Sequence, residues 1–305
     1  MAPALIALIG YGEVGRILAE DLRAAGRAVA AYDLELSTGL AEPLRAHARA
    51  HQVTLADSHA GAVRDAELVI SAVTAGQTIA AAKACAPALS RNAFFLDLNS
   101  ASPGAKRRAA ELVAAGAGWF VEGAVMTSVP PHRLKVPLLL GGPHAAQLAP
   151  LLDELGFAPR VASAKLGIAS ATKMCRSVVI KGLEALVVES LVAARCHGVE
   201  DAVLTSLDET FPQVDWEKQA AYFFQRVIQH GRRRSDEMHE AAATVRETGL
   251  TPWGATASAQ RQSWVADLAD RGVFGDRESP SFARSPDWRV EADRLLEALQ
   301  AEKAD

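Results

Sequence analysis

The stretch ALIALIGYGEVG, residues 4–15, decides the fold of this chain. It begins with an apolar run of the length of one strand and ends in the pattern G-x-G-x-x-G. An amphipathic stretch rich in Ala and Leu follows, and a second apolar run, AVAAY, then leads into Asp33. Glycine-rich hexapeptides also occur by chance. A glycine turn between a strand and a helix, with an acid about twenty positions further on, is nevertheless the fingerprint of a dinucleotide-binding βαβ unit.

Each glycine of this turn has its own expected role. Gly10 allows the tight turn out of the strand, Gly12 lets the backbone approach a pyrophosphate, and Gly15 lets the helix pack closely on the strand. The first N–H groups of the helix lack intrahelical partners and favour a bound anion. The other cofactor-binding residues predicted in the turn are Tyr11, Glu13 and Val14.

Asp33 predicts which nicotinamide cofactor binds. Its carboxylate would accept hydrogen bonds from a ribose 2′-hydroxyl and would repel a 2′-phosphate. Leu34 follows it, so the arginine expected for a 2′-phosphate is absent. The sequence therefore predicts NAD, with NADP as the less favoured cofactor. The alternative is an ordinary βαβ unit with a glycine-rich turn.

Length and composition indicate a two-domain cytoplasmic protein. At 305 residues, the chain exceeds the length of about 250–300 residues at which single cores stop growing. Half of the residues are apolar, yet no apolar run reaches the roughly 18 residues of a membrane span. The net charge of −4 gives no general attraction to nucleic acid or to membrane surfaces. Three cysteines without paired spacing fit a reducing cytoplasm.

Residues 1–164 alternate short apolar runs with helical patterns, which is typical of a parallel sheet covered on both faces. The sequence therefore predicts an α/β fold with an N-terminal, doubly wound Rossmann domain. After AVAAY, the expected strands are Val53–Ala56, Glu67–Val73, Phe94–Leu98, Trp119–Val125 and Val136–Gly142. Helical stretches such as 77–89 and 104–115 lie between them. Further cofactor-binding candidates at the end of the run 67–73 are Ala72, Val73 and Thr74.

Residues 165–305 are expected to form an all-α domain, joined to the first domain by a long helix. One helical pattern without proline runs from about 168 to 197 and ends at Gly198. At 1.5 Å per residue it would be about 45 Å long, which suits a connection between two bodies or the centre of a subunit interface. Further helices are expected at 199–207, 215–230, 235–248, 254–269 and 290–301.

Lys173 lies near the start of this long helix, in the segment GIASATKMCRS (167–177). Ser177 follows four residues later, on the same face. A lysine on a helix usually belongs to a solvated polar stripe. At the junction of two domains, however, a lysine would lie where a substrate cleft forms and could transfer protons. The spacing alone leaves both interpretations open.

Four segments together resemble the β-hydroxyacid dehydrogenase superfamily, which includes 6-phosphogluconate and 3-hydroxyisobutyrate dehydrogenases. They are the glycine turn, DLNSASP (97–103), VEGAVMTS (121–128) running on to LLLGG (138–142), and the helix that carries Lys173. They are similar to the family motifs G-x-G-x-x-G, D-x-S-T-x-x-P, D-A-P-V-S-G-G and G-x-x-G-x-x-x-K-x-x-x-N. The resemblance implies that Asn99 and Ser100 line the nicotinamide, and that Lys173 is the general acid and base.

Two departures alter the substrate side of this resemblance. Met126, Thr127 and Ser128 stand where the family has Ser-Gly-Gly, which changes the usual contact with a substrate carboxylate. Ser177 stands where the family has Asn, and its side chain is shorter. The resemblance implies that these four residues bind the substrate. The segment around Pro130-Pro131, the Lys173 helix and HGRRRSDEM (230–238) resemble one branch, whose phosphogluconate-dehydrogenase-like C-terminal domain has no assigned function.

The basic run Arg232–Arg234 is open to two interpretations. A charge run normally forms a solvated face. In the family, the corresponding helix meets the cleft, often that of a partner subunit, and an arginine there would bind a carboxylate or phosphate. The resemblance thus makes Arg234 a substrate-binding candidate. The eight histidines show no metal-ligand spacing together with the cysteines, so no metal site is predicted.

We expect an NAD(P)-dependent oxidoreductase that transfers a hydride between nicotinamide and a small hydroxy acid or related polar alcohol. Lys173 would take the hydroxyl proton in oxidation and return it in reduction. Two alternatives stay open: an imine-type reductase on the same scaffold, and a regulatory protein that binds NAD(P) without turnover. The length of the helix and the resemblance also predict a homodimer formed through the helical domain.

Overall fold

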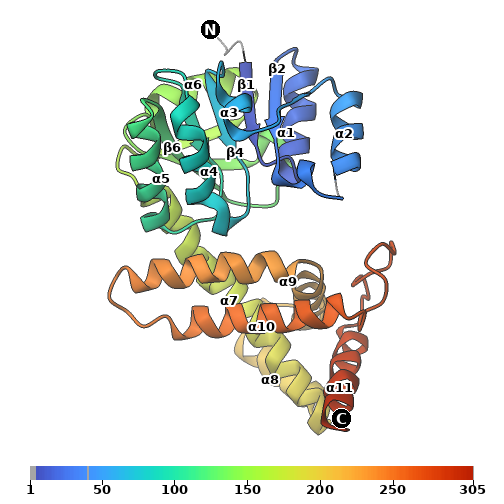
Figure 1. Ribbon diagram of the computed structural model, residues 1–305. Coiled ribbons are helices and arrows are strands. Elements are labelled where there is room, and N and C mark those ends of the chain that lie inside the picture. The colour runs from blue at the N-terminus through green and yellow to red at the C-terminus, as the bar shows by residue number, and fades with distance from the viewer. Residues whose placement is uncertain (1–4, 40, 305) are drawn as a thin grey trace. The chain divides into compact units, whose positions relative to one another are not determined.

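Parallel strands alternate with helices through the first part of the chain (Figure 1). The computed structural model describes residues 5–39 and 41–304. The sheet has the strand order β3-β2-β1-β4-β5-β6-β7-β8. Strands β1 to β6 run parallel, β7 runs antiparallel to β6, and β8 runs parallel to β7. The strands are β1 (Leu5–Ile9), β2 (Ala28–Tyr32), β3 (Thr54–Leu55), β4 (Leu68–Ser71), β5 (Phe94–Asp97), β6 (Trp119–Val125), β7 (Pro137–Gly141) and β8 (Ala158–Ser163).

Helices cover both faces of this sheet. Successive side chains of a strand point to opposite faces, so Ile6 and Leu8 belong to one apolar core, whereas Ala7 and Ile9 belong to another. The first core is completed by α1 (Glu13–Ala24), α2 (Ala41–Ala50) and α6 (Ala145–Glu154). The second is completed by α3 (His59–Val63), α4 (Thr78–Cys85) and α5 (Pro103–Ala115). The two covered faces and the order of β1 to β6 confirm the predicted Rossmann domain.

The last strand, β8, was not predicted from the sequence. Most of its side chains are exposed or half-buried, because it forms the edge of the sheet beside β7. An edge strand of this kind does not require an apolar run. The sequence APRVAS (158–163) therefore lacks the pattern by which the other strands were recognised.

The chain divides into two compact units, unit 1 (residues 1–175) and unit 2 (residues 176–305). The division falls within α7 (Ile168–His197), and the predicted range of this helix is confirmed. The beginning of α7 belongs to unit 1, whereas the sequence predicts a domain boundary before the helix, at 164/165. Among the described residues, no helix combines the length and the apolar character needed to cross a membrane.

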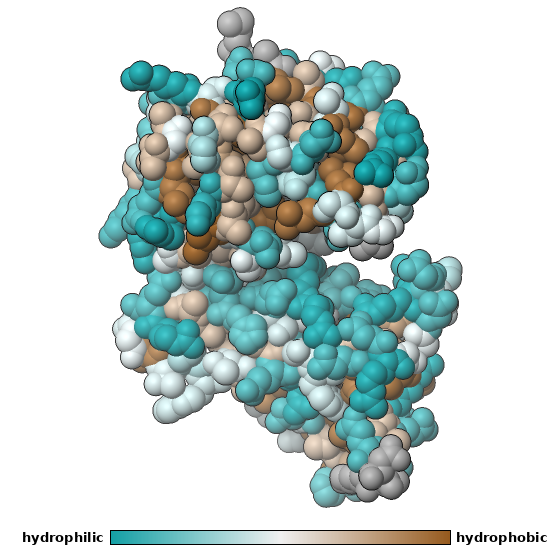
Figure 2. All heavy atoms as spheres, in the orientation of Figure 1, coloured by the Kyte–Doolittle hydropathy of each residue, from teal (hydrophilic) through white to brown (hydrophobic). Residues whose placement is uncertain are grey.

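Unit 2 is helical, as predicted. Its core includes aromatic side chains such as Phe224 and Trp288, whose ring centroids lie 5.7 Å apart. On the face shown in Figure 2, the surface of this unit is mostly hydrophilic, which agrees with an apolar core inside the unit. The helices that follow α7 are α8 (Glu200–Thr210), α9 (Trp216–Arg246), α10 (Trp253–Asp270) and α11 (Trp288–Ala304).

One helix prediction is wrong. The sequence predicts two helices, at 215–230 and 235–248, but α9 is continuous through this region. Gly231 remains helical and serves the close packing of α9 against α10, because a Cβ there would collide with the carbonyl oxygen of Gln262. The basic run that follows is also helical. Its last two arginines form ion pairs with Glu237 and Glu184.

Candidate functional site

The predicted cofactor-binding residues gather at one edge of the sheet. Ile9 at the end of β1 pairs with Tyr32 and with Ser71. Ser71 in turn pairs with Asp97, so four parallel strands end in register. The loops after these strands therefore lie along the carboxyl edge, around the switch point between β1 and β4 where ligands of such sheets bind. These loops and the first turn of α1 carry the predicted residues Gly10 to Gly15, Asp33, Ala72 to Thr74, Asn99 and Ser100.

The glycine turn is crowded toward the sheet and open at its centre. Gly10 has a φ of +94°, and a Cβ there would collide with the backbone of Ala72. A Cβ at Gly15 would overlap the carbonyl oxygen of Gly10. At Gly12, by contrast, a Cβ would meet no described atom within 4 Å. Gly12 is also the N-cap of α1, so the N-terminus of this helix is open to an anion there.

Asp33 is held beside the same turn. Its Oδ2 accepts a hydrogen bond from the backbone N–H of Tyr11 at 2.6 Å, and its Oδ1 accepts one from the N–H of Glu35 at 2.9 Å. A carboxylate has about four lone-pair sites, so acceptor capacity is left for a ribose hydroxyl. Asp33 thus lies at the end of β2 in the arrangement that ribose recognition requires.

Asn99 contributes a buried acceptor to the loop after β5. Its backbone N–H donates to Asp97 Oδ1 at 2.9 Å, and its Nδ2 donates to Ser71 Oγ at 3.0 Å. Its Oδ1 is buried and has no hydrogen-bond partner among the described residues. Buried polar atoms in proteins are nearly always paired. A donor group of a bound ligand would satisfy this oxygen.

A buried ion pair supports this loop. Lys106 Nζ lies 3.1 Å from Asp97 Oδ1 and donates to the carbonyl oxygen of Asp97 at 2.9 Å. Burial raises the pKa of Asp97, and the Lys106 ammonium opposes that rise. Because Lys106 belongs to α5, the pair holds this helix against the end of β5. The loop that carries Asn99 and Ser100 is thereby fixed.

Lys173 reaches the same loop from α7. Its Nζ donates to Ser100 Oγ at 2.7 Å, and the side chain is half-buried. Both residues belong to unit 1. The structure thus brings Lys173 together with a residue for which the sequence predicted a position beside the nicotinamide.

Glu122, which was not predicted as a functional residue, fixes the beginning of α7. Its fully buried carboxylate accepts hydrogen bonds at Oε1 from the N–H groups of Gly167 and Ala169, at 2.8 and 3.1 Å. At Oε2 it accepts them from the N–H and the hydroxyl of Ser170, at 3.3 and 2.7 Å. It therefore takes up donors that a helix N-terminus leaves unpaired. The signal was available, since a lone acid in the apolar run WFVEGAV requires a buried partner.

Met126 connects the predicted substrate loop to α7. It packs against a buried cluster formed by Ala124, Leu139 and Ala169, and Ala169 lies one helical turn before Lys173. Thr127 and Ser128 are exposed. The first residue of the predicted loop thus packs against a cluster that includes Ala169 of the Lys173 helix, and the other two are accessible to a ligand.

The remaining two predicted substrate residues, Ser177 and Arg234, belong to unit 2. Ser177 Oγ accepts a hydrogen bond from Lys181 Nζ at 3.0 Å, and Lys181 also forms an ion pair with Glu237. Arg234 is buried and forms an ion pair with Glu184, whose pKa is raised by burial. The Nε of Arg234 has no partner among the described residues. The substrate-binding roles of Ser177 and Arg234 stay predictions.

The site fits a nicotinamide dinucleotide. There is room for a pyrophosphate at Gly12, a carboxylate for a ribose hydroxyl at Asp33, and a buried acceptor for a carboxamide N–H at Asn99. The fold and these residues define the class of nicotinamide-binding oxidoreductases.

The chain belongs to a known family. Residues 5–157 match the NAD binding domain of 6-phosphogluconate dehydrogenase. Residues 194–265 match a domain of unknown function, DUF1932. The protein is therefore a member of the β-hydroxyacid dehydrogenase superfamily, in the branch whose C-terminal domain has no assigned function. Both the predicted superfamily and the predicted branch are confirmed.

Solved structures show the same fold. A conserved hypothetical protein from Sinorhizobium meliloti is 37% identical over 96% of each chain, with a TM-score of 0.74. The 3-hydroxyisobutyrate dehydrogenase of Mycobacterium tuberculosis with L-serine is 18% identical, covers 97% of this chain and 99% of its own, and has a TM-score of 0.65. An imine reductase from Myxococcus stipitatus in complex with NADP⁺ is 18% identical, covers 88% and 95%, and has a TM-score of 0.53. At 18% identity, the likeness concerns the fold alone.

Proposed function

We propose that this protein is an NAD-dependent dehydrogenase that transfers a hydride between nicotinamide and a small hydroxy acid or related polar alcohol. Lys173 acts as the general acid and base. The observation that carries this proposal is the 2.7 Å hydrogen bond from Lys173 Nζ to Ser100 Oγ. Ser100 follows β5 at the carboxyl edge of the sheet, beside Asn99, so a proton donor lies at the expected nicotinamide end.

Each residue of the site has a separate role in the proposed reaction. Nicotinamide, when held by these residues, would supply the hydride chemistry in either direction. Neutral Lys173 accepts the proton of the substrate hydroxyl, and its ammonium form donates that proton in the reverse direction. Ser100 orients the amine through its hydrogen bond, and Glu122 holds the helix that carries it. Asn99 Oδ1 is available to the carboxamide of the nicotinamide.

Substrate contacts are proposed for the loop after β6 and for unit 2. Thr127 and Ser128 carry exposed hydroxyl groups that can donate to a carboxylate. Met126 supports this loop against α7. In unit 2, Ser177 lies one turn beyond Lys173 along α7, and Arg234 is retained as a candidate contact for an anionic group.

A substrate screen tests the proposal directly. The protein is incubated with NAD and NADP against panels of hydroxy acids, ketoacids and cyclic imines, and the nicotinamide absorbance is followed. Turnover of a hydroxy acid or ketoacid is expected, because a lysine at this position suits proton transfer to oxygen. Turnover of imines alone would favour an imine-type reductase. Tight NAD binding without turnover of any compound would favour a regulatory protein.

The substitution Asp33→Asn is expected to shift cofactor preference from NAD toward NADP. The amide keeps an acceptor for Tyr11 but loses the charge that strengthens hydrogen bonds from ribose and repels a 2′-phosphate. The Kd for NAD should rise about tenfold, the effect of losing roughly 1.4 kcal/mol from a charged hydrogen bond, while the Kd for NADP falls. Calorimetric titration measures both constants. Asp153→Asn, on the exposed surface of α6, is the control; an unchanged ratio of the two Kd values would contradict the role of Asp33.

The substitution Gly12→Ala separates cofactor binding from folding. Gly12 has an extended backbone with a negative φ of −71°, and the Cβ of an alanine there would meet no described atom within 4 Å. The melting temperature should therefore stay unchanged. The methyl group would occupy the space that a pyrophosphate needs, so the Kd for NAD should rise about tenfold or more, or roughly 1.4 kcal/mol. Gly254→Ala in α10, where a Cβ also meets open space, should change neither quantity. Unaltered NAD binding by Gly12→Ala would exclude a pyrophosphate at this turn.

We also propose that the protein forms a homodimer through unit 2. Val179 and Leu186 on α7 are 66% and 63% exposed. They lie seven residues apart and share one face of the helix. A stripe of exposed apolar side chains of this kind favours coverage by a second copy.

A further inference from the structure

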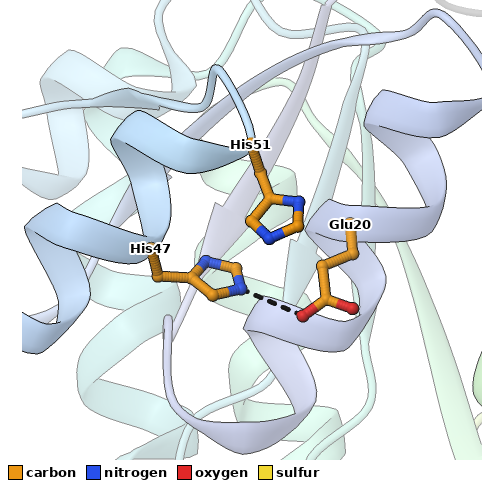
Figure 3. A group of neighbouring side chains, drawn as sticks. All are labelled: Glu20, His47 and His51. Carbon is orange, nitrogen blue, oxygen red and sulfur yellow. Dashed lines mark hydrogen bonds and ion pairs between the residues drawn. The ribbon is translucent and has the colours of Figure 1, made fainter.

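Glu20, His47 and His51 form a cluster outside the site described above (Figure 3). Glu20 lies on α1, His47 lies in the last turn of α2, and His51 directly follows that helix. One ligand atom from each residue lies within 4.8 Å of the other two. It is the one group of this kind among the described residues. All three residues are half-buried, so an ion from solvent can reach them.

The two histidines are arranged to act together. They are four residues apart, which brings them to one face of the chain as it leaves α2. Their rings are stacked, with centroids 4.5 Å apart and an interplanar angle of 27°. Figure 3 shows both rings and the Glu20 carboxylate turned toward the space between α1 and α2.

Tyr11 holds the ring of His47 from the other side. Its hydroxyl lies 2.9 Å from His47 Nδ1, while His47 Nε2 lies 3.0 Å from Glu20 Oε1. A tyrosine hydroxyl both donates and accepts. The ring can therefore carry its proton on Nδ1, keep its bond to Tyr11, and present the Nε2 lone pair to an ion; metal-binding histidines characteristically have such an outer partner.

Arg133 holds the carboxylate of Glu20 in a similar way. Its Nη2 donates to Glu20 Oε2 at 2.7 Å, and its Nε donates to Asp21 Oδ1 at 2.8 Å. One oxygen of Glu20 is thereby fixed, and the other, Oε1, faces the histidines. Carboxylates that bind metals are commonly oriented by hydrogen bonds of this kind.

We propose that Glu20, His47 and His51 bind a divalent transition-metal ion of the zinc class. Two imidazole nitrogens and one carboxylate oxygen suit zinc, cobalt or nickel, whereas magnesium and calcium prefer ligand sets made of oxygen alone. Zinc bonds of about 2.0–2.2 Å join ligand atoms up to about 4 Å apart, so small side-chain rotations complete the set. Three protein ligands leave further coordination positions for water.

The bound ion would link three parts of unit 1. It would join α1 to α2 through its ligands, and it would contact the glycine turn through His47 and Tyr11. An ion that binds only the folded chain stabilises it by an amount that grows with the logarithm of its affinity. The inference does not depend on the proposed dehydrogenase activity, because binding and thermal stability report on it directly.

Metal binding by the full-length protein, without a histidine tag and after treatment with a chelator, tests the proposal. Calorimetric titration with Zn²⁺ should show one site per chain and a raised melting temperature, and Co²⁺ should give the visible absorption of a bound ion. His47→Ala and His51→Ala should each lower Zn²⁺ affinity by more than the roughly 10–100-fold that loss of an outer partner costs. Tyr11→Phe, which removes only the outer hydroxyl, should lower it by roughly 10–100-fold. His239→Ala, an exposed histidine of α9, should bind as the unaltered protein does.

Two results would overturn the proposal. One is the absence of saturable Zn²⁺ binding by the chelator-treated protein. The other is binding that His47→Ala and His51→Ala leave unchanged, which would assign the ion to other residues such as the exposed thiols of Cys175 and Cys196. Circular dichroism of each variant shows that it is folded. If loss of the His47 side chain disturbs folding, His51→Ala still tests the proposal.

Discussion

Replacement of Lys173 by methionine is expected to lower kcat by about 10²–10⁴-fold, the usual contribution of a general acid or base. Methionine is similar in length to lysine and keeps its apolar contacts, but it neither donates to Ser100 nor transfers a proton. The Kd for NAD should stay unchanged, because the glycine turn and Asp33 are untouched. Steady-state kinetics on the substrate found by the screen, together with calorimetric titration of NAD, measure the two effects.

A second substitution at this position tests whether Lys173 acts by transferring a proton or only through its positive charge. Lys173→Arg keeps a cationic donor for Ser100 but, with a pKa above about 12, releases no proton at neutral pH. It should therefore be nearly as inactive as Lys173→Met. Lys165→Met, an exposed lysine before α7, is the matched control and should be fully active. Normal kcat in Lys173→Met, or recovery of activity in Lys173→Arg, would exclude Lys173 as the general acid and base.

Replacement of Glu122 by alanine is expected to destabilise unit 1 by about 3 kcal/mol or more, since buried donors left without an acceptor cost roughly 1–3 kcal/mol each. Glu122 accepts hydrogen bonds from three backbone N–H groups and one hydroxyl at the start of α7. Denaturant unfolding measures the loss of free energy. Removal of an exposed acid, Glu111→Ala, should change it by no more than about 0.5 kcal/mol.

The isosteric substitution Glu122→Gln tests whether this residue also positions Lys173. The amide keeps one acceptor oxygen and the volume of the side chain, so the protein should fold and bind NAD. The start of α7 loses part of its anchor, and kcat should fall because Lys173 is less well held at Ser100. Unchanged stability and unchanged kcat in both Glu122 variants would show that the carboxylate neither anchors the helix nor positions the lysine.

Structural features that depend on a local run of residues could be predicted from the sequence. The glycine turn was recognisable because it lies between an apolar run and an amphipathic helix, and the full range of α7 was predicted because its helical pattern is unbroken. The same local reasoning failed at Gly231. A glycine followed by three arginines favours a break, but the glycine is required by the close approach of α10, which is distant in sequence.

Contacts between segments that are distant in the sequence could not be predicted from it. The partners of Glu122 lie 45 to 48 residues away in the sequence. The apolar run around Glu122 indicates that its side chain is buried, but it does not indicate which groups the carboxylate contacts. The cluster of Glu20, His47 and His51 combines residues from α1 and from the end of α2, so no local spacing of histidines with cysteines marks it. Family resemblance gave Lys173 and Ser100 separate roles at the nicotinamide, and the hydrogen bond between them comes from the structure.

Because Glu122 anchors the start of α7 to unit 1, the position of Lys173 does not depend on the sequence of unit 2. On the proposed assignment, the cofactor residues and the proton donor all belong to the unit that contains the sheet. The position of Lys173 relative to the cofactor residues is therefore set within unit 1, which ends at Cys175. On the same assignment, changes in unit 2 would alter the substrate contacts proposed for Ser177 and Arg234 and would leave Lys173 and the cofactor residues in place.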